Sequence, residues 1–399
     1  MKVRVIDSIM GSGKTQFIIQ QMNEVNDKRY IYITPFLSEV ERVKSNVKNK
    51  RFYEPIQRGK GKLSSFVNLI KQGKDIVSTH ALFSTANEEV ITLLKLNNYS
   101  LVLDEVMDVI DIVGIEKDDL DILINGKMII VNEEGNVIWN KEEYNGKKFK
   151  DIKVMAQHNR LIMSNNSLML WMFPVDVFKC FDEVLILTYM FNGQIMKYYY
   201  DLYNIKYEYN SVKLIGDKFE LIEYEDGKKT ILDLINIEND RKLNVIGREK
   251  FNLSYSWYNI AKDSYLEVMK RNLNNFFKNK YDAKSKDILW TTFLGSDDRI
   301  RKALHSKGFQ SRKCFAPMNS RATNEYSDRT IVAYTVNRFI NPYLKNFFVK
   351  KGIEVDENVY ALSEMLQFIF RSGVRNGKKI QLYIPSRRMR NLLLNFISK

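Results

Sequence analysis

The strongest constraint on the fold is an octet near the start of the chain, Ser8-Ile9-Met10-Gly11-Ser12-Gly13-Lys14-Thr15. It follows a short apolar run at residues 3–6 and precedes a helix-compatible segment at residues 17–19. A strand, a glycine-rich loop and a helix in this order are typical of a phosphate-binding loop, in which backbone N–H groups surround a phosphate. The helix adds the positive end of its dipole. We therefore expect a nucleotide to be bound through its phosphates by Gly11, Ser12, Gly13, Lys14 and Thr15.

Two side chains of this loop have separate tasks in such a site. Lys14 can reach the β- and γ-phosphates, and the Thr15 hydroxyl can hold Mg²⁺. The usual pattern, G-x-x-x-x-G-K-[ST], has glycine where this chain has Ser8, and many nucleotide-driven motors carry another small residue there. A glycine turn that precedes a lysine by chance is the alternative interpretation. The order of strand, loop and helix favours the phosphate loop.

A second chemical signal is the pair Asp104-Glu105, which directly follows an apolar strand at residues 99–103, about ninety residues after the loop. Carboxylates at the carboxyl end of such a strand lie where ligands bind in parallel α/β sheets. We expect Asp104 to hold Mg²⁺ through its water shell. Glu105 is then expected to orient and deprotonate the water that attacks the γ-phosphate.

The composition narrows the class of protein. Among 399 residues, Lys and Arg number 62 against 48 acidic residues, a net charge of +14 that favours polyanionic partners such as nucleic acid. The hydrophobic fraction of 45% favours a globular chain over a disordered one. Cys180 and Cys314 form neither a disulfide framework nor a C-x-x-C zinc motif. No apolar run reaches the roughly 18 to 20 residues of a membrane span, so we expect a cytoplasmic protein without membrane contact.

Short apolar segments alternate with helical segments along most of the chain, which predicts an α/β fold with parallel sheets. No second phosphate loop occurs in the second half. Near the end, a helical segment at 361–370 leads into two arginines, Arg371 and Arg375. The expected organisation is a first unit at 1–210 with a small β-hairpin insertion at about 114–153, a connecting β segment at 211–250, and a second unit at 251–399.

This set of motifs resembles the superfamily 2 helicases, especially forms encoded by phages and large DNA viruses. The matching stretches are residues 10–15 for their first motif, Thr34-Pro35 for the Ia motif, residues 104–107 for the D-E-x-x motif, residues 187–189 for the third motif, and Gln367 with Arg371 and Arg375 for the sixth. The resemblance implies two RecA-like lobes, with ATP and Mg²⁺ bound between them and a nucleic-acid strand crossing both. In the family's sixth motif the arginines are three residues apart, whereas here they are four apart.

The resemblance also implies roles for further residues. Gln367, Arg371 and Arg375 are expected to act on ATP together with Glu105, with one arginine as the finger that stabilises charge on the transferred phosphoryl group. The fifth motif is expected at residues 321–325. The residues expected to contact nucleic acid are Thr34, Pro35, Thr79, His80 and Thr323.

The function that these observations favour is an ATP-dependent helicase or translocase, acting on DNA rather than RNA in viral replication, within the host cytoplasm. It would track a single strand and could cooperate with replication proteins. A genome-packaging terminase-type ATPase is one alternative, and nuclease activity on plasmid DNA with Mn²⁺ would identify it. The other alternative is a non-motor nucleic-acid-binding protein that ATP switches. Stimulation of ATP hydrolysis by single-stranded DNA separates the motor from the switch.

Overall fold

The computed structural model describes the whole chain except residues 58–60, 166, 226–231, 307, 310–311, 319–324 and 399. The chain divides into two compact units. The first contains residues 1–8, 12–225 and 341–355, and the second contains residues 9–11, 226–340 and 356–399. In the described part of the chain, we find no helix that combines the length and the apolar surface needed to span a bilayer.

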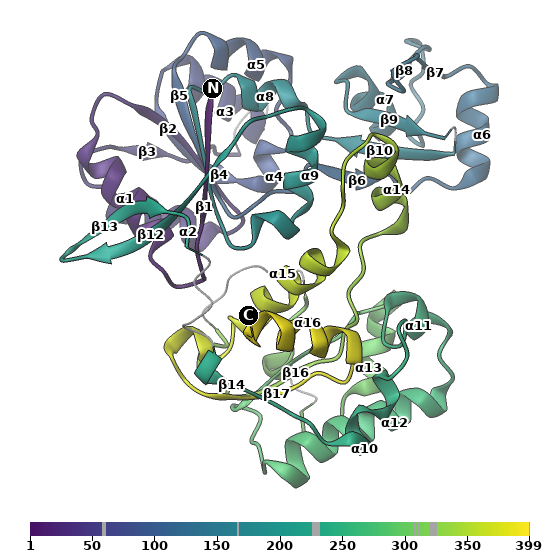
Figure 1. The fold of residues 1–399 in the computed structure, drawn as a ribbon. Coiled ribbons are helices and arrows are strands. Elements are labelled where there is room, and N and C mark those ends of the chain that lie inside the picture. The colour runs from purple at the N-terminus through teal and green to yellow at the C-terminus, as the bar shows by residue number, and fades with distance from the viewer. Residues whose placement is uncertain are drawn as a thin grey trace. The chain divides into compact units, whose positions relative to one another are not determined.

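An eight-stranded sheet forms the centre of the first unit (Figure 1). Neighbouring strands are parallel, apart from an antiparallel hairpin of β12 and β13 at one edge. In spatial order the strands are β13 (Lys218–Glu223), β12 (Glu208–Ile215), β1 (Lys2–Asp7), β11 (Glu183–Thr188), β5 (Tyr99–Asp104), β2 (Arg29–Thr34), β4 (Asp75–Thr79) and β3 (Phe52–Tyr53).

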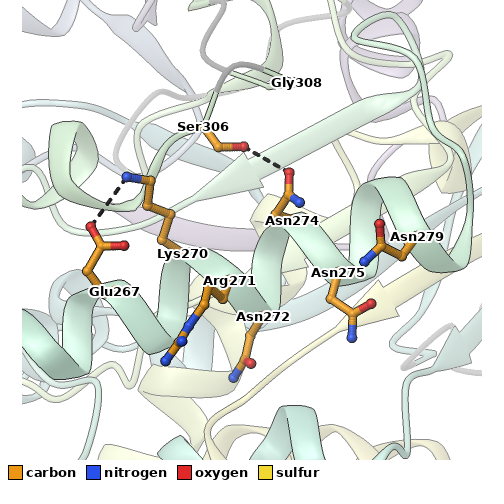
Figure 2. Close-up of a pocket in the computed structure, with 9 residues that line it drawn as sticks. All are labelled: Glu267, Lys270, Arg271, Asn272, Asn274, Asn275, Asn279, Ser306 and Gly308. Carbon is orange, nitrogen blue, oxygen red and sulfur yellow. Dashed lines mark hydrogen bonds and ion pairs between the residues drawn. The ribbon is translucent and has the colours of Figure 1, made fainter.

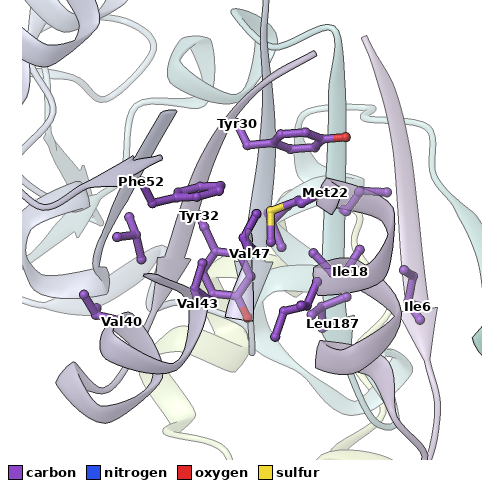
Figure 3. Close-up of a cluster of buried hydrophobic side chains, with 14 of the residues drawn as sticks. Ile6, Ile18, Met22, Tyr30, Tyr32, Val40, Val43, Val47, Phe52 and Leu187 are labelled. Carbon is purple, nitrogen blue, oxygen red and sulfur yellow. The ribbon is translucent and has the colours of Figure 1, made fainter. Parts of the chain in front are cut away.

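The central strands are continuous apolar runs because both faces of a parallel sheet are covered. All six residues of β11 are buried. On one face, α1 (Lys14–Glu24) and α2 (Leu37–Asn46) pack Ile18, Met22 and Val43 against the sheet (Figure 3). Outside the insertion described next, the other described helices of this unit are α3 (Lys62–Lys71), α4 (His80–Phe83), α5 (Glu88–Lys95), α8 (Val175–Lys179), η1 (Phe191–Gly193), α9 (Ile195–Leu202) and α14 (Pro342–Lys350).

Between β5 and β11 the chain forms an insertion with its own apolar core, which includes Leu123, Trp139 and Leu161. The hairpin expected from the sequence is present as β7 and β8, and three further antiparallel strands, β6, β9 and β10, lie beyond the expected limits. These strands have three to five residues, too few to show a clear alternation. The elements are β6 (Ile110–Ile112), α6 (Lys117–Asn125), β7 (Ile129–Val131), β8 (Val137–Trp139), α7 (Lys150–Gln157), β9 (Leu161–Ser164) and β10 (Leu168–Met172).

A second parallel sheet forms the centre of the second unit, in the order β14 (Ile235–Ile237), β17 (Ile380–Tyr383), β16 (Ile331–Tyr334) and β15 (Ile288–Thr291). Its helices are η3 (Leu232–Leu234), α10 (Arg241–Asn244), η4 (Val245–Gly247), α11 (Tyr255–Ile260), α12 (Asp263–Asn274), the π-helix η5 (Asn275–Lys280), η6 (Ser296–Asp298), α13 (Arg299–Leu304), η7 (Arg312–Cys314), α15 (Glu357–Ile369), η8 (Gly373–Asn376) and α16 (Arg387–Ser398). Two units with parallel sheets confirm the predicted α/β fold class.

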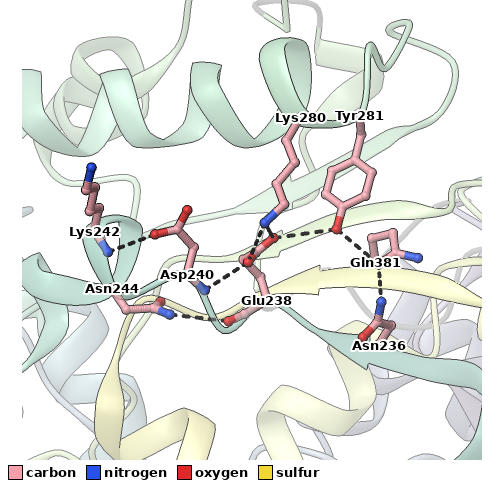
Figure 4. Close-up of polar contacts among 8 residues, drawn as sticks. All are labelled: Asn236, Glu238, Asp240, Lys242, Asn244, Lys280, Tyr281 and Gln381. Atoms are coloured by element: carbon pink, nitrogen blue, oxygen red, sulfur yellow. Dashed lines mark hydrogen bonds and ion pairs between the residues drawn. The ribbon is translucent and has the colours of Figure 1, made fainter.

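A buried glutamate, Glu238, ties the edge strand of the second sheet to the π-helix (Figure 4). It follows β14, and its carboxylate lies 2.7 Å from Lys280 Nζ. The backbone N–H of Asp240 donates to the same carboxylate at 2.9 Å. Tyr281 lies beside it and donates to the side chain of Gln381 on β17. The network satisfies a carboxylate that would otherwise be buried without partners.

The hairpin of β12 and β13 falls partly in the stretch expected to connect the two halves, yet it belongs to the first sheet. β12 pairs in parallel with β1, with Arg4 opposite Glu208 and Ile6 opposite Asn210. This pairing covers the backbone of β1, which would otherwise be an exposed sheet edge. Likewise α14, from the second half of the sequence, belongs to the first unit, where Lys350 donates to Asn165 at 2.9 Å.

Candidate nucleotide site

The carboxyl ends of five neighbouring strands bring polar residues to one edge of the first sheet. In spatial order, β1 ends at Asp7, β11 at Thr188, β5 at Asp104, β2 at Thr34 and β4 at Thr79. The register pairs Asp7 with Thr188 and Thr34 with Thr79, so these strand ends are level. Ligands of parallel α/β sheets bind at this edge. The predicted phosphate loop follows β1 at the same edge.

The backbone of the loop has the conformation that phosphate binding needs. Gly11 and Gly13 have φ of 86° and 95°, in the left-handed region that glycine adopts at no steric cost. The buried Lys14 donates from Nζ to the Ser8 carbonyl at 2.6 Å, which keeps its ammonium at the loop. Among the described residues the buried Ser12 hydroxyl oxygen has no hydrogen-bond partner. A phosphate oxygen in the loop would provide that partner.

The β12 and β13 hairpin braces the loop at both ends. Ser8 Oγ accepts the backbone N–H of Val212 at 3.0 Å, which gives the serine at this usual glycine position a structural task. At the other end, a Cβ on Gly13 would lie 2.0 Å from the Phe219 ring. Gln20 on α1 hydrogen-bonds both the N–H and the carbonyl of Phe219, at 3.1 and 3.3 Å. The glycine at position 13 is therefore required by packing as well as by φ.

Two oxygen groups that could bind Mg²⁺, the Thr15 hydroxyl and the Asp104 carboxylate, lie close together beside the loop. Thr15 Oγ1 lies 3.5 Å from Asp104 Oδ1, and the buried Thr34 donates from Oγ1 to Asp104 Oδ2 at 3.5 Å. Within the described ranges, no group of three or more His, Cys, Asp or Glu side chains is placed to hold a metal ion. Mg²⁺ is commonly held by one or two protein oxygens together with phosphate oxygens and water. The pair of Thr15 and Asp104 fits that mode of binding.

The electrostatics of Asp104 also fit a cation. The pKa of Asp104 is raised from 3.8 to about 7, mainly by burial and in addition by the nearby carboxylates of Glu105 and Glu39. Lys14 acts in the opposite direction. A divalent cation at this carboxylate favours its charged form and therefore offsets the effect of burial.

This pKa predicts a pH-dependent gain in stability for Asp104→Asn without divalent cations. The raised pKa means that the protonated carboxyl favours the folded state below pH 4, and that this contribution is lost as the pH rises through 7. Asparagine resembles the protonated form, so the variant should melt above the wild type at pH 8, by an amount that shrinks toward pH 4. Melting temperatures in EDTA from pH 4 to 8 test this. The exposed Asp176→Asn is the control, and an equal rise there would contradict the explanation.

Glu105 leaves β5 in a strained conformation. Its φ is 70°, in the left-handed region, which costs a residue other than glycine about 1–3 kcal/mol. Its N–H donates to the Leu187 carbonyl of β11 at 3.0 Å, so the neighbouring strand holds the strained backbone in place. Such strain is concentrated at functional sites. The geometry is compatible with the predicted role of Glu105 as the base.

The predicted nucleic-acid residues have different surroundings. Thr34 is fully buried and its hydroxyl contacts Asp104, so it lies in the nucleotide site rather than on a free surface. Pro35, Thr79 and His80 are partly exposed on the same edge, where β4 ends and α4 begins. Thr323 lies outside the described residues, together with the rest of residues 321–324 of the expected fifth motif.

The two predicted arginines of the second unit differ sharply. Arg371 is 4% exposed, and its guanidinium donates to the carbonyls of Pro317 and Met318, each at 2.9 Å. These contacts are internal to the second unit and favour a structural role. Arg375 lies on η8 and is partly exposed, as is Gln367 on α15. Arg375 is therefore the better candidate for the finger.

Sequence reasoning missed three contributors to this site: Asp7, Gln194 and Phe219. Asp7 is 1% exposed at the end of β1, where burial raises its pKa against the opposing effects of two backbone N–H groups and of Lys14. Asp7 could have been recognised from the sequence, because it is a carboxylate that directly precedes the loop. Gln194 and Phe219 had no local signal, because their importance comes from contacts with distant residues.

A separate pocket of about 580 Å³ lies on the second unit and contains none of the predicted site residues (Figure 2). Four asparagines on α12 and η5 line it beside Lys270 and Arg271. Ser306 donates to Asn274 at 3.1 Å, and Lys270 pairs with Glu267 at 3.3 Å. Several of its polar side chains are thus already engaged with one another.

Comparison with known proteins identifies relatives. Residues 110–171 match the YonV middle domain, and residues 229–397 match the YonV C-terminal Rossmann-like domain. The chain is 42% identical to the SPbeta prophage-derived uncharacterized protein YonV of Bacillus subtilis (strain 168), over 99% of this chain and 98% of that protein. Solved structures with a similar course include S. tokodaii Xpd4, at 11% identity over 99% of this chain and 94% of that one, with a TM-score of 0.49. An XPD helicase, at 14% identity over 99% and 95%, has a TM-score of 0.40.

Proposed function

Because the chain belongs to the YonV family, whose Bacillus subtilis member is named only as an uncharacterized prophage-derived protein, we propose its function from the geometry of its own site. We propose an ATP hydrolase that moves along nucleic acid, as a helicase or translocase. One observation carries the proposal. The phosphate loop follows β1, and Asp104 and Glu105 lie at the carboxyl end of β5, one strand away in the same sheet, with Thr15 Oγ1 and Asp104 Oδ1 3.5 Å apart.

Each residue of this edge has a task that matches its position. The glycine backbone and Lys14 bind the β- and γ-phosphates. Thr15 and Asp104 would hold Mg²⁺, which neutralises charge that develops on the phosphoryl oxygens. Glu105 orients the attacking water and accepts its proton. The proposed finger, Arg375, comes from the second unit, which has no phosphate loop in its sequence.

The nucleic-acid part of the proposal is supported by chemistry at the same edge and by charge. Beyond the buried Thr34 the same ends of the strands carry Pro35, Thr79 and His80, which are partly exposed, and the polar groups of Thr79 and His80 can contact a phosphate backbone. The net charge of +14 favours a polyanion. The prophage origin of the Bacillus subtilis relative supports a role on phage DNA. Single-stranded DNA is therefore the proposed track, with replication proteins as further partners.

We predict that single-stranded DNA increases the steady-state rate of ATP hydrolysis more than RNA or duplex DNA of equal length. Binding should weaken steeply with salt, because each phosphate neutralised on a single strand contributes a slope of about −0.7 to log affinity against log salt. Hydrolysis and binding at 50 to 300 mM salt test this, with Lys14→Ala as the control for contaminating activity. ATP hydrolysis that no nucleic acid changes would contradict a motor, and a flat salt response would contradict a backbone-tracking groove.

A further inference from the structure

The carboxylate of Asp7 binds the backbone of a segment almost two hundred residues away. Asp7 Oδ1 accepts the N–H of Met190 at 2.8 Å, and Oδ2 accepts the N–H of Phe191 at 2.8 Å. The carbonyl of Asp7 accepts Ser211 Oγ at 2.9 Å. Asp7 therefore joins the start of the phosphate loop to the turn after β11 and to the β12 strand.

Asp7 contacts the turn formed by residues 188–194, and hydrogen bonds from Gln194 join the two ends of this turn. Gln194 donates from Nε2 to Thr188 Oγ1 and to the Tyr189 carbonyl, each at 2.9 Å. Met190 has φ of 56°, an unusual conformation for its type. Leaving the N–H groups of Met190 and Phe191 without Asp7 would be costly, because Phe191 is fully buried and Met190 is partly buried.

This turn lies between the phosphate loop and the carboxylates of Asp104 and Glu105. β11 is placed between β1, which carries the phosphate loop, and β5, which carries Asp104 and Glu105. The Thr188 carbonyl accepts the N–H of Ser8 at 3.0 Å, and the Leu187 carbonyl accepts the N–H of Glu105 at 3.0 Å. A shift of this turn would therefore move the loop and the proposed base relative to each other.

We propose that Asp7 is a positioning residue for hydrolysis, which holds the turn at 188–194 level with the phosphate loop so that Glu105 is aligned on the attacking water. The inference rests on the proposed function. Asp7 acts through the turn and touches no substrate. Replacing Asp7 should therefore slow the chemical step and leave ATP binding nearly unchanged, because the loop residues that bind phosphate are still present.

The test compares Asp7→Asn with Asp75→Asn, after normalising rates to the concentration of nucleotide-binding sites. Both changes replace a carboxylate that accepts backbone N–H within the first unit by an amide, which keeps one acceptor oxygen; Asp7 uses both of its oxygens, whereas Asp75 uses one. Asp75, whose Oδ1 accepts the Tyr30 N–H at 2.8 Å, is the first residue of β4 and lies at the amino ends of the strands, away from the candidate site. Asp7→Asn should lower kcat at least tenfold with the KM for ATP within twofold of wild type. Asp75→Asn should leave both within twofold. Equal effects of the two variants on kcat would overturn the proposal.

A second measurement does not depend on activity. Amide hydrogen exchange in peptides that cover 188–194 should slow when a non-hydrolysable ATP analogue binds the wild type. In Asp7→Asn the same peptides should exchange faster and lose that response, while α1 keeps its own. If the wild type binds nucleotide without hydrolysing it, the proposed function fails, and exchange still decides the role of Asp7. An unchanged response of 188–194 in Asp7→Asn would refute the coupling.

Discussion

Glu105→Gln should stop ATP turnover while ATP binding remains. Glutamine keeps the size of the side chain but cannot accept the proton of the attacking water, and general base catalysis typically contributes a factor of about 10² to 10⁴ in rate. Thr15 and Asp104 are both kept in this variant, so the affinity for Mg-ATP should stay within a few-fold of wild type. Single-turnover hydrolysis together with equilibrium binding of a fluorescent ATP analogue measures the two effects separately.

Two further variants make this result specific. Lys14→Ala should lose both binding and hydrolysis, because the phosphates lose their main cation and Lys14 lies at the loop itself. Glu183→Gln is the matched control. Glu183 is a buried glutamate of the same sheet, at the amino end of β11 and away from the candidate site, where it pairs with Arg4 and Lys28 at 3.0 and 2.8 Å. Near-normal turnover in Glu105→Gln would remove Glu105 from the role of base.

Arg375→Ala should lower ATP turnover by orders of magnitude with little change in melting temperature. The second unit has no phosphate loop in its sequence, so the proposed charge partner of Arg375 is the ATP bound by Lys14. An arginine finger is worth roughly 10³ to 10⁵ in rate. Arg375→Lys should recover only part of the activity, because lysine keeps the charge but lacks the planar fork of guanidinium. Turnover in the presence of single-stranded DNA is the measurement.

Arg371→Ala is the natural contrast to that variant. Because Arg371 is buried and donates to two backbone carbonyls, its loss should destabilise the second unit by about 1–3 kcal/mol for each unsatisfied group. Its melting temperature should fall, and the rate for each folded molecule should stay near wild type at low temperature. The opposite pattern, with a stable but inactive Arg371→Ala and an active Arg375→Ala, would assign the finger to Arg371. Normal turnover in both variants would contradict an arginine finger altogether.

Much of the candidate site could be proposed from the sequence because its motifs are local. The phosphate loop needs two glycines, a lysine and a threonine within a few residues, between a strand and a helix, and all of these are adjacent in sequence. Asp104 and Glu105 were readable for the same reason, since they directly follow an apolar strand. The alternation of short apolar segments with helical segments likewise predicted the parallel sheets, because parallel strands need a connection that crosses over the sheet.

Other properties depend on which distant residues meet. Ser8 replaces the usual glycine and accepts a hydrogen bond from Val212, 204 positions away. Thr34 was expected at nucleic acid, but it is buried against Asp104 because β2 and β5 are neighbours. Arg371 and Arg375 look equivalent in sequence, but in the structure Arg371 is buried and donates to the carbonyls of Pro317 and Met318, whereas Arg375 is partly exposed. Local propensity carries no information about such partners, since strand order and edge pairing are set by packing of the whole sheet.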